Sequence, residues 1–136
     1  MPDASFDAPP FLGGVHVLLV EHDRDSLEVL KAILEYAGAL VAPGASAREA
    51  LRALERIRPD VIVADLAMPG DDAYRLIGDV RSQAHSRPIA AIALAGQPSP
   101  EDRRRALAAG FQSYLSKPVD PWELCRLVAE LARRGG

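Results

Sequence analysis

Short apolar runs alternate with amphipathic stretches five times along the chain. Runs such as residues 15–20, interrupted only by His16, have no regular polar position, which is typical of strands covered on both faces. The amphipathic stretches repeat their apolar residues at helical spacing, as Leu27, Leu30 and Leu34 do. Strands that alternate with helices in this way predict βαβ units and a parallel sheet.

Helix-capping residues stand before several of the predicted helices. A side-chain oxygen at this position accepts hydrogen bonds from N–H groups that the first turn leaves free. Ser46 and Ser99 offer a hydroxyl for this purpose, and Asp120 offers a carboxylate. For the third helix, Asp71 or Asp72 is expected to be the cap.

Ionisable side chains stand at the carboxyl ends of three predicted strands. Glu21 and His22 follow the first apolar run, Asp65 follows the third, and Lys117 follows the fifth. Because right-handed crossovers bring the carboxyl ends of parallel strands to one edge, we expect these side chains to converge. We therefore predict a flavodoxin-like α/β fold, in which a five-stranded parallel sheet of order 2-1-3-4-5 carries helices on both faces.

The composition is that of a single domain. At 136 residues the chain is long enough to bury a core without disulfides or metal ions. Hydrophobic residues make up 49% and charged residues 26%, and no apolar run approaches the roughly 18 residues that span a bilayer. We expect a cytoplasmic protein without membrane contact, with a flexible arm at residues 1–14 and one domain at residues 15–134.

The charge balance gives no sign of a nucleic-acid partner. The formal net charge is −3 and the isoelectric point is near 5.6, so the chain lacks the overall excess of positive charge that is typical of nucleic-acid-binding proteins. The basic run at residues 103–105 is expected to be the solvated face of a helix. The single cysteine, Cys125, cannot form an internal disulfide and is expected to be a small buried hydrophobe.

The ordered motifs resemble the receiver domain of bacterial two-component response regulators. They are an acid cluster after the first strand, Asp65 shortly before a Met-Pro pair, and Lys117 directly before a proline. The resemblance runs over residues 15–131. It implies a signalling module, not an enzyme, in which Asp65 accepts a phosphoryl group from a partner histidine kinase or phosphotransfer protein. Lys117 would neutralise the charge of that group, and its bond to the proline is expected to be cis.

The resemblance also implies a magnesium site, and one of its positions differs in this chain. In the family, the ligands correspond to Glu21, Asp65 and the backbone carbonyl of Ala67, together with a second acid where His22 stands here. Mg2+ takes oxygen ligands in near-octahedral geometry and has little use for imidazole nitrogen. We therefore expect magnesium binding to be weak or absent.

A second position that departs from the family lies at the end of the fourth strand. Ala95 stands where the family has Thr or Ser, whose hydroxyl contacts the phosphoryl group. Alanine has no donor to offer. Tyr114 matches the aromatic residue that switches with that hydroxyl, although a half-buried strand tyrosine would look the same. Two mechanisms stay open: phosphorylation at Asp65, or a pseudo-receiver that signals through protein–protein interaction alone.

The resemblance also indicates a surface for partners or for a homodimer. Receivers commonly use the face built from the fourth helix, fifth strand and fifth helix. In this chain the face would lie around Arg103, Tyr114 and Trp122. The tryptophan is either an exposed aromatic anchor or a side chain folded back on the core.

Two enzyme-related alternatives fit the sequence less well. A phosphatase of the haloacid dehalogenase type needs a second aspartate two residues after its nucleophile, and here that position is Ala67. A flavodoxin-like nucleotide binder needs Gly, Ser or Thr donors after the first strand, whereas Glu21 and Asp23 would repel phosphate. Neither explains Lys117 before a proline.

Overall fold

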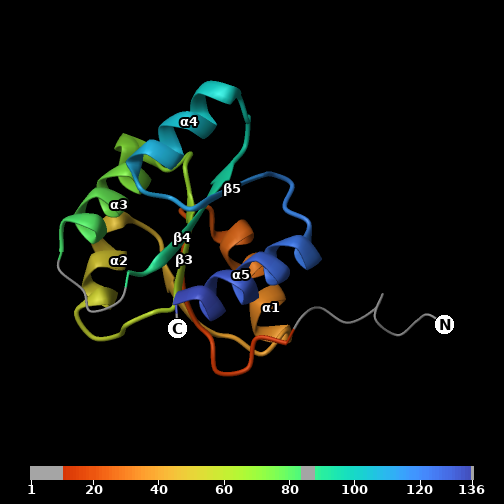
Figure 1. Ribbon diagram of the computed structural model, residues 1–136. Coiled ribbons are helices and arrows are strands. Elements are labelled where there is room, and N and C mark those ends of the chain that lie inside the picture. Colours follow the sequence, from red (N-terminus) through yellow and green to blue (C-terminus); the bar gives the residue numbers. More distant parts are fainter. Residues whose placement is uncertain (1–10, 84–87, 136) are drawn as a thin grey trace.

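The computed structural model describes residues 11–83 and 88–135 of the chain. Five parallel strands form one sheet that helices cover on both faces (Figure 1). The strand order is β2-β1-β3-β4-β5, so the predicted flavodoxin-like α/β fold is confirmed. In chain order the elements are β1 (His16–Val20), α1 (Arg24–Tyr36), β2 (Leu40–Gly44), α2 (Ala47–Leu54), β3 (Val61–Asp65), a 3-10 turn (Pro69–Asp71), α3 (Asp72–Ser82), β4 (Ala90–Ala95), α4 (Pro100–Ala109), β5 (Ser113–Ser116) and α5 (Pro121–Gly135).

Different helices pack the two faces of the sheet. Val17 and Leu19 of β1 belong to the core beneath α1 and α5, whereas Leu18 and Val20 belong to the core beneath α2, α3 and α4. Because successive side chains of a strand alternate between faces, a central strand buries every residue. This burial explains the continuous apolar runs of the sequence. The packing on both faces also sets the position of the residue at the carboxyl end of each strand. In the described part of the chain, no helix is long and apolar enough to cross a membrane.

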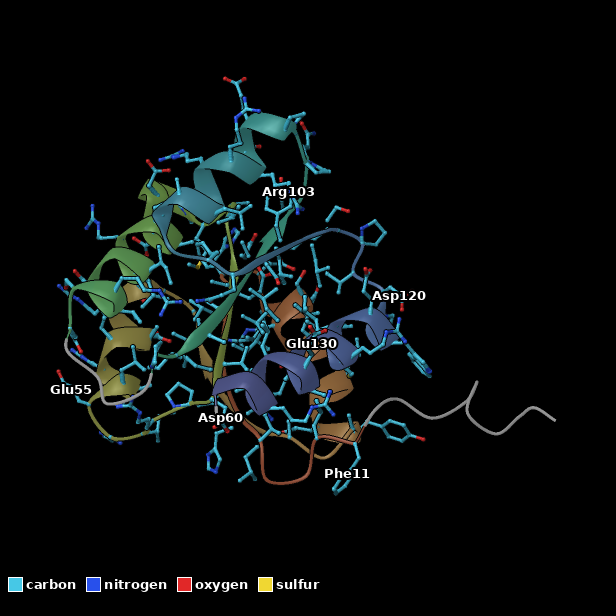
Figure 2. All side chains as sticks on the ribbon, viewed as in Figure 1. Phe11, Glu55, Asp60, Arg103, Asp120 and Glu130 are labelled. Atoms are coloured by element: carbon cyan, nitrogen blue, oxygen red, sulfur yellow. The ribbon has the colours of Figure 1, made fainter. Side chains whose placement is uncertain are left out.

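Three of the four predicted helix caps form as expected. The side chains of Ser46, Ser99 and Asp120 each accept backbone N–H groups at the start of the following helix, and Asp120 lies at the N-terminal end of α5 (Figure 2). The prediction for α3 is wrong, because Asp71 has a left-handed backbone and its side chain makes no cap bond. Asp72 instead accepts the Ala47 N–H at 3.1 Å, which joins the start of α3 to the start of α2.

The N-terminal boundary of the domain lies earlier than expected. The sequence predicts a flexible arm over residues 1–14, but Leu12 is fully buried in the core. Its N–H donates to the Ala37 carbonyl at 2.7 Å, just after α1 ends. This contact fixes the segment that leads into β1, so residues 11–14 do not form a free arm. The rest of the predicted arm, residues 1–10, lies outside the described residues.

Arg81 connects the last turn of α3 to two segments beside it. Its guanidinium donates to the Gly110 carbonyl at 3.0 Å, to the Ile89 carbonyl at 2.6 Å, and to Gln112 Oε1 at 3.0 Å. The same Gln112 oxygen accepts the Ala91 N–H at 2.7 Å. One half-buried side chain therefore ties α3 to the start of β4 and to the approach to β5.

We predict that Arg81→Met lowers the free energy of unfolding by about 2 to 3 kcal/mol, because partly buried carbonyls lose a charged donor. Urea denaturation monitored by circular dichroism would measure the change. The matched control is Arg75→Met on the exposed face of the same helix, for which we expect a change within about 0.5 kcal/mol. Equal stabilities of the two variants would contradict the role given to Arg81.

Candidate functional site

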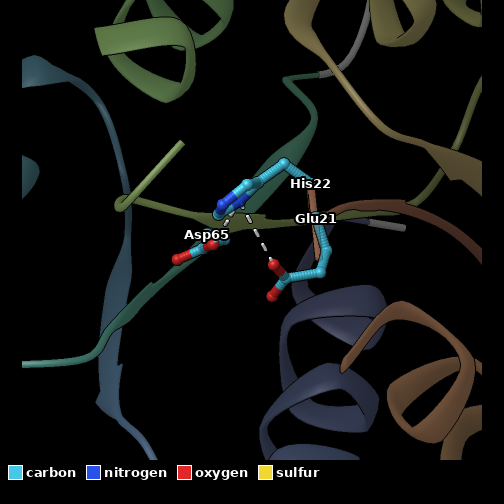
Figure 3. A group of neighbouring side chains, drawn as sticks. All are labelled: Glu21, His22 and Asp65. Atoms are coloured by element: carbon cyan, nitrogen blue, oxygen red, sulfur yellow. Dashed lines mark ion pairs between the residues drawn. The ribbon is translucent and has the colours of Figure 1, made fainter. Parts of the chain in front are cut away.

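The ionisable residues that follow three strands meet at one edge of the sheet. Glu21 and His22 come from the end of β1 and Asp65 from the end of β3, and the three side chains face one another (Figure 3). Lys117 reaches the same place from the end of β5. The convergence predicted from the sequence is therefore present, across residues that lie up to 96 positions apart.

Lys117 joins the two acids. Its Nζ lies 2.9 Å from Glu21 Oε1 and 3.3 Å from Asp65 Oδ1. Its backbone N–H donates to the Ala95 carbonyl at 2.8 Å, which fixes the lysine to the end of β4. The bond between Lys117 and Pro118 is cis, as expected.

Burial and neighbouring charges act on the two carboxyl groups differently. Glu21 is 1% exposed and Asp65 is 0% exposed. Burial raises the pKa of Glu21, and the adjacent Asp65 raises it further, while Lys117 opposes the rise. Burial also acts to raise the pKa of Asp65, but the Ala67 N–H, Glu21 and Lys117 together hold it below its usual value. The pocket therefore favours ionisation at Asp65 over ionisation at Glu21.

The ammonium of Lys117 is held in its charged form by the same acids. Burial lowers the pKa of Lys117, but the hydrogen bond to Glu21 and the charge of Asp65 outweigh that effect and leave the pKa raised. The positive charge beside Asp65 is thus a stable feature of the site.

His22 lies on the other side of both carboxylates. Its Nδ1 is 3.3 Å from Asp65 Oδ2 and 3.5 Å from Glu21 Oε2, and its side chain is 42% exposed (Figure 3). Each acid therefore gives one oxygen to Lys117 and turns the other toward the imidazole. Asp65 Oδ2 is buried and accepts no hydrogen bond from the described residues.

Backbone groups hold the two acids in place. The Ala67 N–H donates to Asp65 Oδ1 at 3.0 Å, and the Asp23 N–H donates to Glu21 Oε2 at 3.1 Å. The Asp23 side chain caps α1 through the Ser26 N–H at 2.9 Å, so it is engaged elsewhere. Sequence reasoning missed the contact between Asp23 and Glu21, because every residue type except proline offers a backbone N–H donor.

Three of these side chains could hold a metal ion. Glu21, His22 and Asp65 each offer one donor atom, and the three atoms lie within 4.8 Å of one another. Two carboxylate oxygens with an imidazole nitrogen suit a divalent cation that accepts nitrogen ligands better than they suit Mg2+. The ligand role expected for the Ala67 carbonyl remains a prediction.

Ala95 and Tyr114 lie beside the site without joining it through side chains. Ala95 is 4% exposed at the end of β4, and its methyl group has nothing to donate. Tyr114 is half-buried in β5, and its hydroxyl is buried without a hydrogen-bond partner among the described residues. The Arg103 guanidinium lies 6.0 Å from the centroid of the Tyr114 ring, at the limit of a cation–π contact.

The position of Trp122 differs from the expectation of an exposed anchor. The residue is half-buried, and its indole nitrogen is buried without a partner among the described residues. It lines a cavity of about 340 Å³ together with Ala32, Ile33, Tyr36 and Pro121. Trp122 and residues of α1 therefore line the same cavity.

A second apolar cavity touches the site at Lys117. It has a volume of about 330 Å³ and lies between α1 and the segment that follows β5. Sequence reasoning missed it, because its two walls are far apart in the chain. Its lining residues are Asp25, Ser26, Val29, Leu30, Ile33, Lys117, Pro118 and Val119.

Comparison with known proteins gives consistent matches. A family model described as the response regulator receiver domain matches residues 17–129. An uncharacterized 14.6 kDa protein of Leptolyngbya boryana is 44% identical over 119 residues, which cover 88% of this chain and 91% of that protein. The transcriptional regulatory protein PrrA of Mycobacterium tuberculosis is 37% identical over 120 residues, covering 88% of this chain and 51% of PrrA. The chain thus spans about half the length of several curated relatives.

Solved structures match over nearly all of the fold. The receiver domain of the Francisella response regulator 1452 superposes with a TM-score of 0.83 at 28% identity. The superposition covers 90% of this chain and 100% of that domain.

We predict that Lys117→Met destabilises the protein by about 2 to 4 kcal/mol at neutral pH, because two buried carboxylates lose their ammonium. Without the lysine both acids should have a pKa above that of the unfolded chain. The folded variant then binds more protons than the unfolded one, so its stability should recover as the pH falls toward 5. Urea denaturation at pH 7 and pH 5 measures both effects.

The control is Lys31→Met, which removes an exposed ion pair with Glu35 on α1. Such pairs contribute little, so we expect a change below about 0.5 kcal/mol with little pH dependence. A Lys117 variant as stable at pH 7 as this control would contradict the prediction.

Proposed function

Because the chain belongs to the response regulator receiver domain family, we propose that it accepts a phosphoryl group on Asp65 from the phosphohistidine of a partner protein. The partner is a sensor histidine kinase or a phosphotransfer protein. One observation carries the proposal: the Lys117 ammonium lies 3.3 Å from Oδ1 of the buried Asp65. The protein signals by changing its state and does not turn over a substrate.

The transfer needs a carboxylate nucleophile and charge neutralisation. A carboxylate oxygen of Asp65 forms a bond to phosphorus while the phosphorus–nitrogen bond of the donor breaks. The leaving imidazole nitrogen keeps the bonding electron pair and takes up a proton, and Asp65 becomes an acyl phosphate. Lys117 stabilises negative charge on the phosphoryl oxygens, since its ammonium already lies beside Asp65.

A divalent cation held by the two acids would offset further charge on the phosphoryl group. Glu21 and Asp65 are the residues that would hold it, with His22 as their neighbour. Since His22 replaces an oxygen ligand, Mg2+ binds weakly or not at all in the unmodified protein.

A second candidate is a pseudo-receiver that acts by phosphorylation-independent protein–protein interaction, and two residues motivate it. Ala95 offers no hydroxyl for a phosphoryl oxygen, and His22 alters the cation site. The labelling experiment below separates the two candidates, because the pseudo-receiver does not require a phosphoryl group on Asp65.

The face formed by α4, β5 and α5 is the proposed surface for a partner or a second copy of the chain. Arg103 is exposed on α4 (Figure 2). Its guanidinium lies 6.0 Å from the centroid of the Tyr114 ring of β5. Trp122 is half-buried and lines the cavity beside α1, so it is not part of this proposal. Because Tyr114 belongs to β5, a rearrangement of its ring would directly alter this surface.

We predict that the protein gains one phosphoryl group when it is incubated with acetyl phosphate or a phosphorylated histidine donor, and that Asp65→Asn abolishes the gain. Intact mass spectrometry would count the groups, and lability to hydroxylamine would identify an acyl phosphate. Asp71→Asn, which changes an exposed acid shortly after Asp65, serves as the control and should label normally. Labelling that persists in Asp65→Asn would contradict the proposed acceptor, and no labelling from any donor would favour the pseudo-receiver.

We further predict that the two departures from the family act on different steps. His22→Asp should create a measurable Mg2+ affinity by calorimetry and raise the magnesium-dependent labelling rate by about tenfold or more, equivalent to about 1.4 kcal/mol. Ala95→Thr should leave that rate nearly unchanged and couple labelling to a rearrangement of the Tyr114 ring, observed by NMR relaxation. Rapid magnesium-dependent labelling of the unmodified protein, with a Tyr114 response, would show that neither departure is disabling.

A further inference from the structure

The carboxylate oxygens of the site are divided between two neighbours. Lys117 takes Glu21 Oε1 and Asp65 Oδ1, whereas His22 faces Glu21 Oε2 and Asp65 Oδ2. We infer that His22 Nδ1, Glu21 Oε2 and Asp65 Oδ2 form a binding site for a divalent transition cation such as Zn2+ or Co2+, in preference to Mg2+.

The two separations from the imidazole suit a shared cation, and all three donor atoms lie within 4.8 Å of one another. Donors about 2.1 Å from one ion are about 3.4 Å apart in a tetrahedral site and about 3.0 Å apart in an octahedral one. His22 Nδ1 lies 3.3 Å from Asp65 Oδ2 and 3.5 Å from Glu21 Oε2. The cation would therefore need little movement of the imidazole, and Lys117 would keep its own two oxygens.

Asp65 Oδ2 independently indicates a missing partner. It is buried, on a side chain only 1% exposed, and accepts no hydrogen bond from the described residues. A buried carboxylate oxygen without a donor is costly, so such atoms are normally hydrogen-bonded, paired or bound to a metal. His22 Nδ1 lies 3.3 Å from this oxygen, and a cation between them would satisfy both atoms.

The surrounding groups are those that support metal ligands. Ligating carboxylates are usually oriented by hydrogen bonds from outside the site. The Ala67 N–H and Lys117 hold the far oxygen of Asp65, whereas the Asp23 N–H donates to Glu21 Oε2, the proposed ligand oxygen itself, at 3.1 Å. Because the His22 side chain is 42% exposed, the cation would keep open positions toward solvent.

Ligand chemistry decides which ion the site takes. Imidazole nitrogen suits Zn2+, Co2+ and their neighbours, and affinity for mixed nitrogen and oxygen sites rises along the first-row divalent series toward copper. Mg2+ gains little from nitrogen and dehydrates reluctantly. One residue, His22, thus changes the ion preference of a pocket whose other groups are oxygens.

This inference deepens the proposed function, since Asp65 serves in both, but it stands on the ligand geometry. Its test contains no phosphoryl donor. Cation binding without labelling would overturn the proposed function alone, and labelling without transition-ion binding would overturn this inference alone.

The experiment titrates the full chain, free of affinity tags, with ZnCl2, CoCl2 and MgCl2 in separate calorimetric runs. The visible absorption of Co2+ reports whether nitrogen and oxygen donors surround the ion, and NMR of the imidazole identifies Nδ1 as the ligand. We expect one Zn2+ or Co2+ per chain, bound about a hundredfold or more tightly than Mg2+.

Variants assign the binding to His22. His22→Ala should weaken Zn2+ and Co2+ binding about tenfold or more, and His22→Asp should shift the preference toward Mg2+. His16→Ala and His85→Ala remove the other two histidines of the chain and should leave binding unchanged. Circular dichroism verifies that each variant is folded. If His22→Ala does not fold, the His22→Asp variant still tests the inference.

Three outcomes would overturn the inference. The first is equal affinity of the unmodified protein for Mg2+ and Co2+. The second is Co2+ affinity that does not change in His22→Ala or that is lost in His16→Ala. The third is absence of binding by any divalent ion, which would leave the imidazole itself as the partner of the two acids.

Discussion

Two carboxylates buried at one edge of the sheet, joined by a single ammonium, are the constraint on which the rest of this structure depends. Glu21 and Asp65 are at most 1% exposed, and Lys117 contacts both. Buried acids this close repel each other unless a cation lies between them. The carboxyl ends of β1, β3 and β5 must therefore lie close together at the same edge of the sheet. The helices packed on both faces of the sheet hold the strands in this position.

Much of this arrangement could be predicted from the sequence, because the signals are local. Continuous apolar runs identify the central strands, and caps such as Ser99 and Asp120 identify helix starts. Once the sheet is parallel, strand ends must share an edge, so the positions of Asp65 and Lys117 follow without any knowledge of contacts. The family resemblance gave the same residues and is consistent with the family match over residues 17–129.

The parts that could not be predicted depend on long-range contacts. Leu12 looks like part of an arm until its N–H is seen to bond Ala37. Asp72 reads as a cap, yet its carboxylate bonds the start of another helix. Trp122 reads as an exposed aromatic until α1 is placed beside it. Likewise, the sequence identifies His22 as a departure, but only the geometry shows that its Nδ1 faces Asp65 Oδ2.

The division of carboxylate oxygens also separates the two departures from each other. His22 acts on Oε2 and Oδ2, on the side away from Lys117, so a change of cation there leaves the ammonium contacts in place. Ala95 acts elsewhere: its backbone carbonyl still binds the Lys117 N–H, while its side chain offers no hydroxyl. The protein thus keeps the backbone connection between the acceptor site and β4 but lacks a side-chain connection toward Tyr114. We therefore propose that cation binding at Asp65 and any coupling to Tyr114 are controlled by different residues, His22 and Ala95.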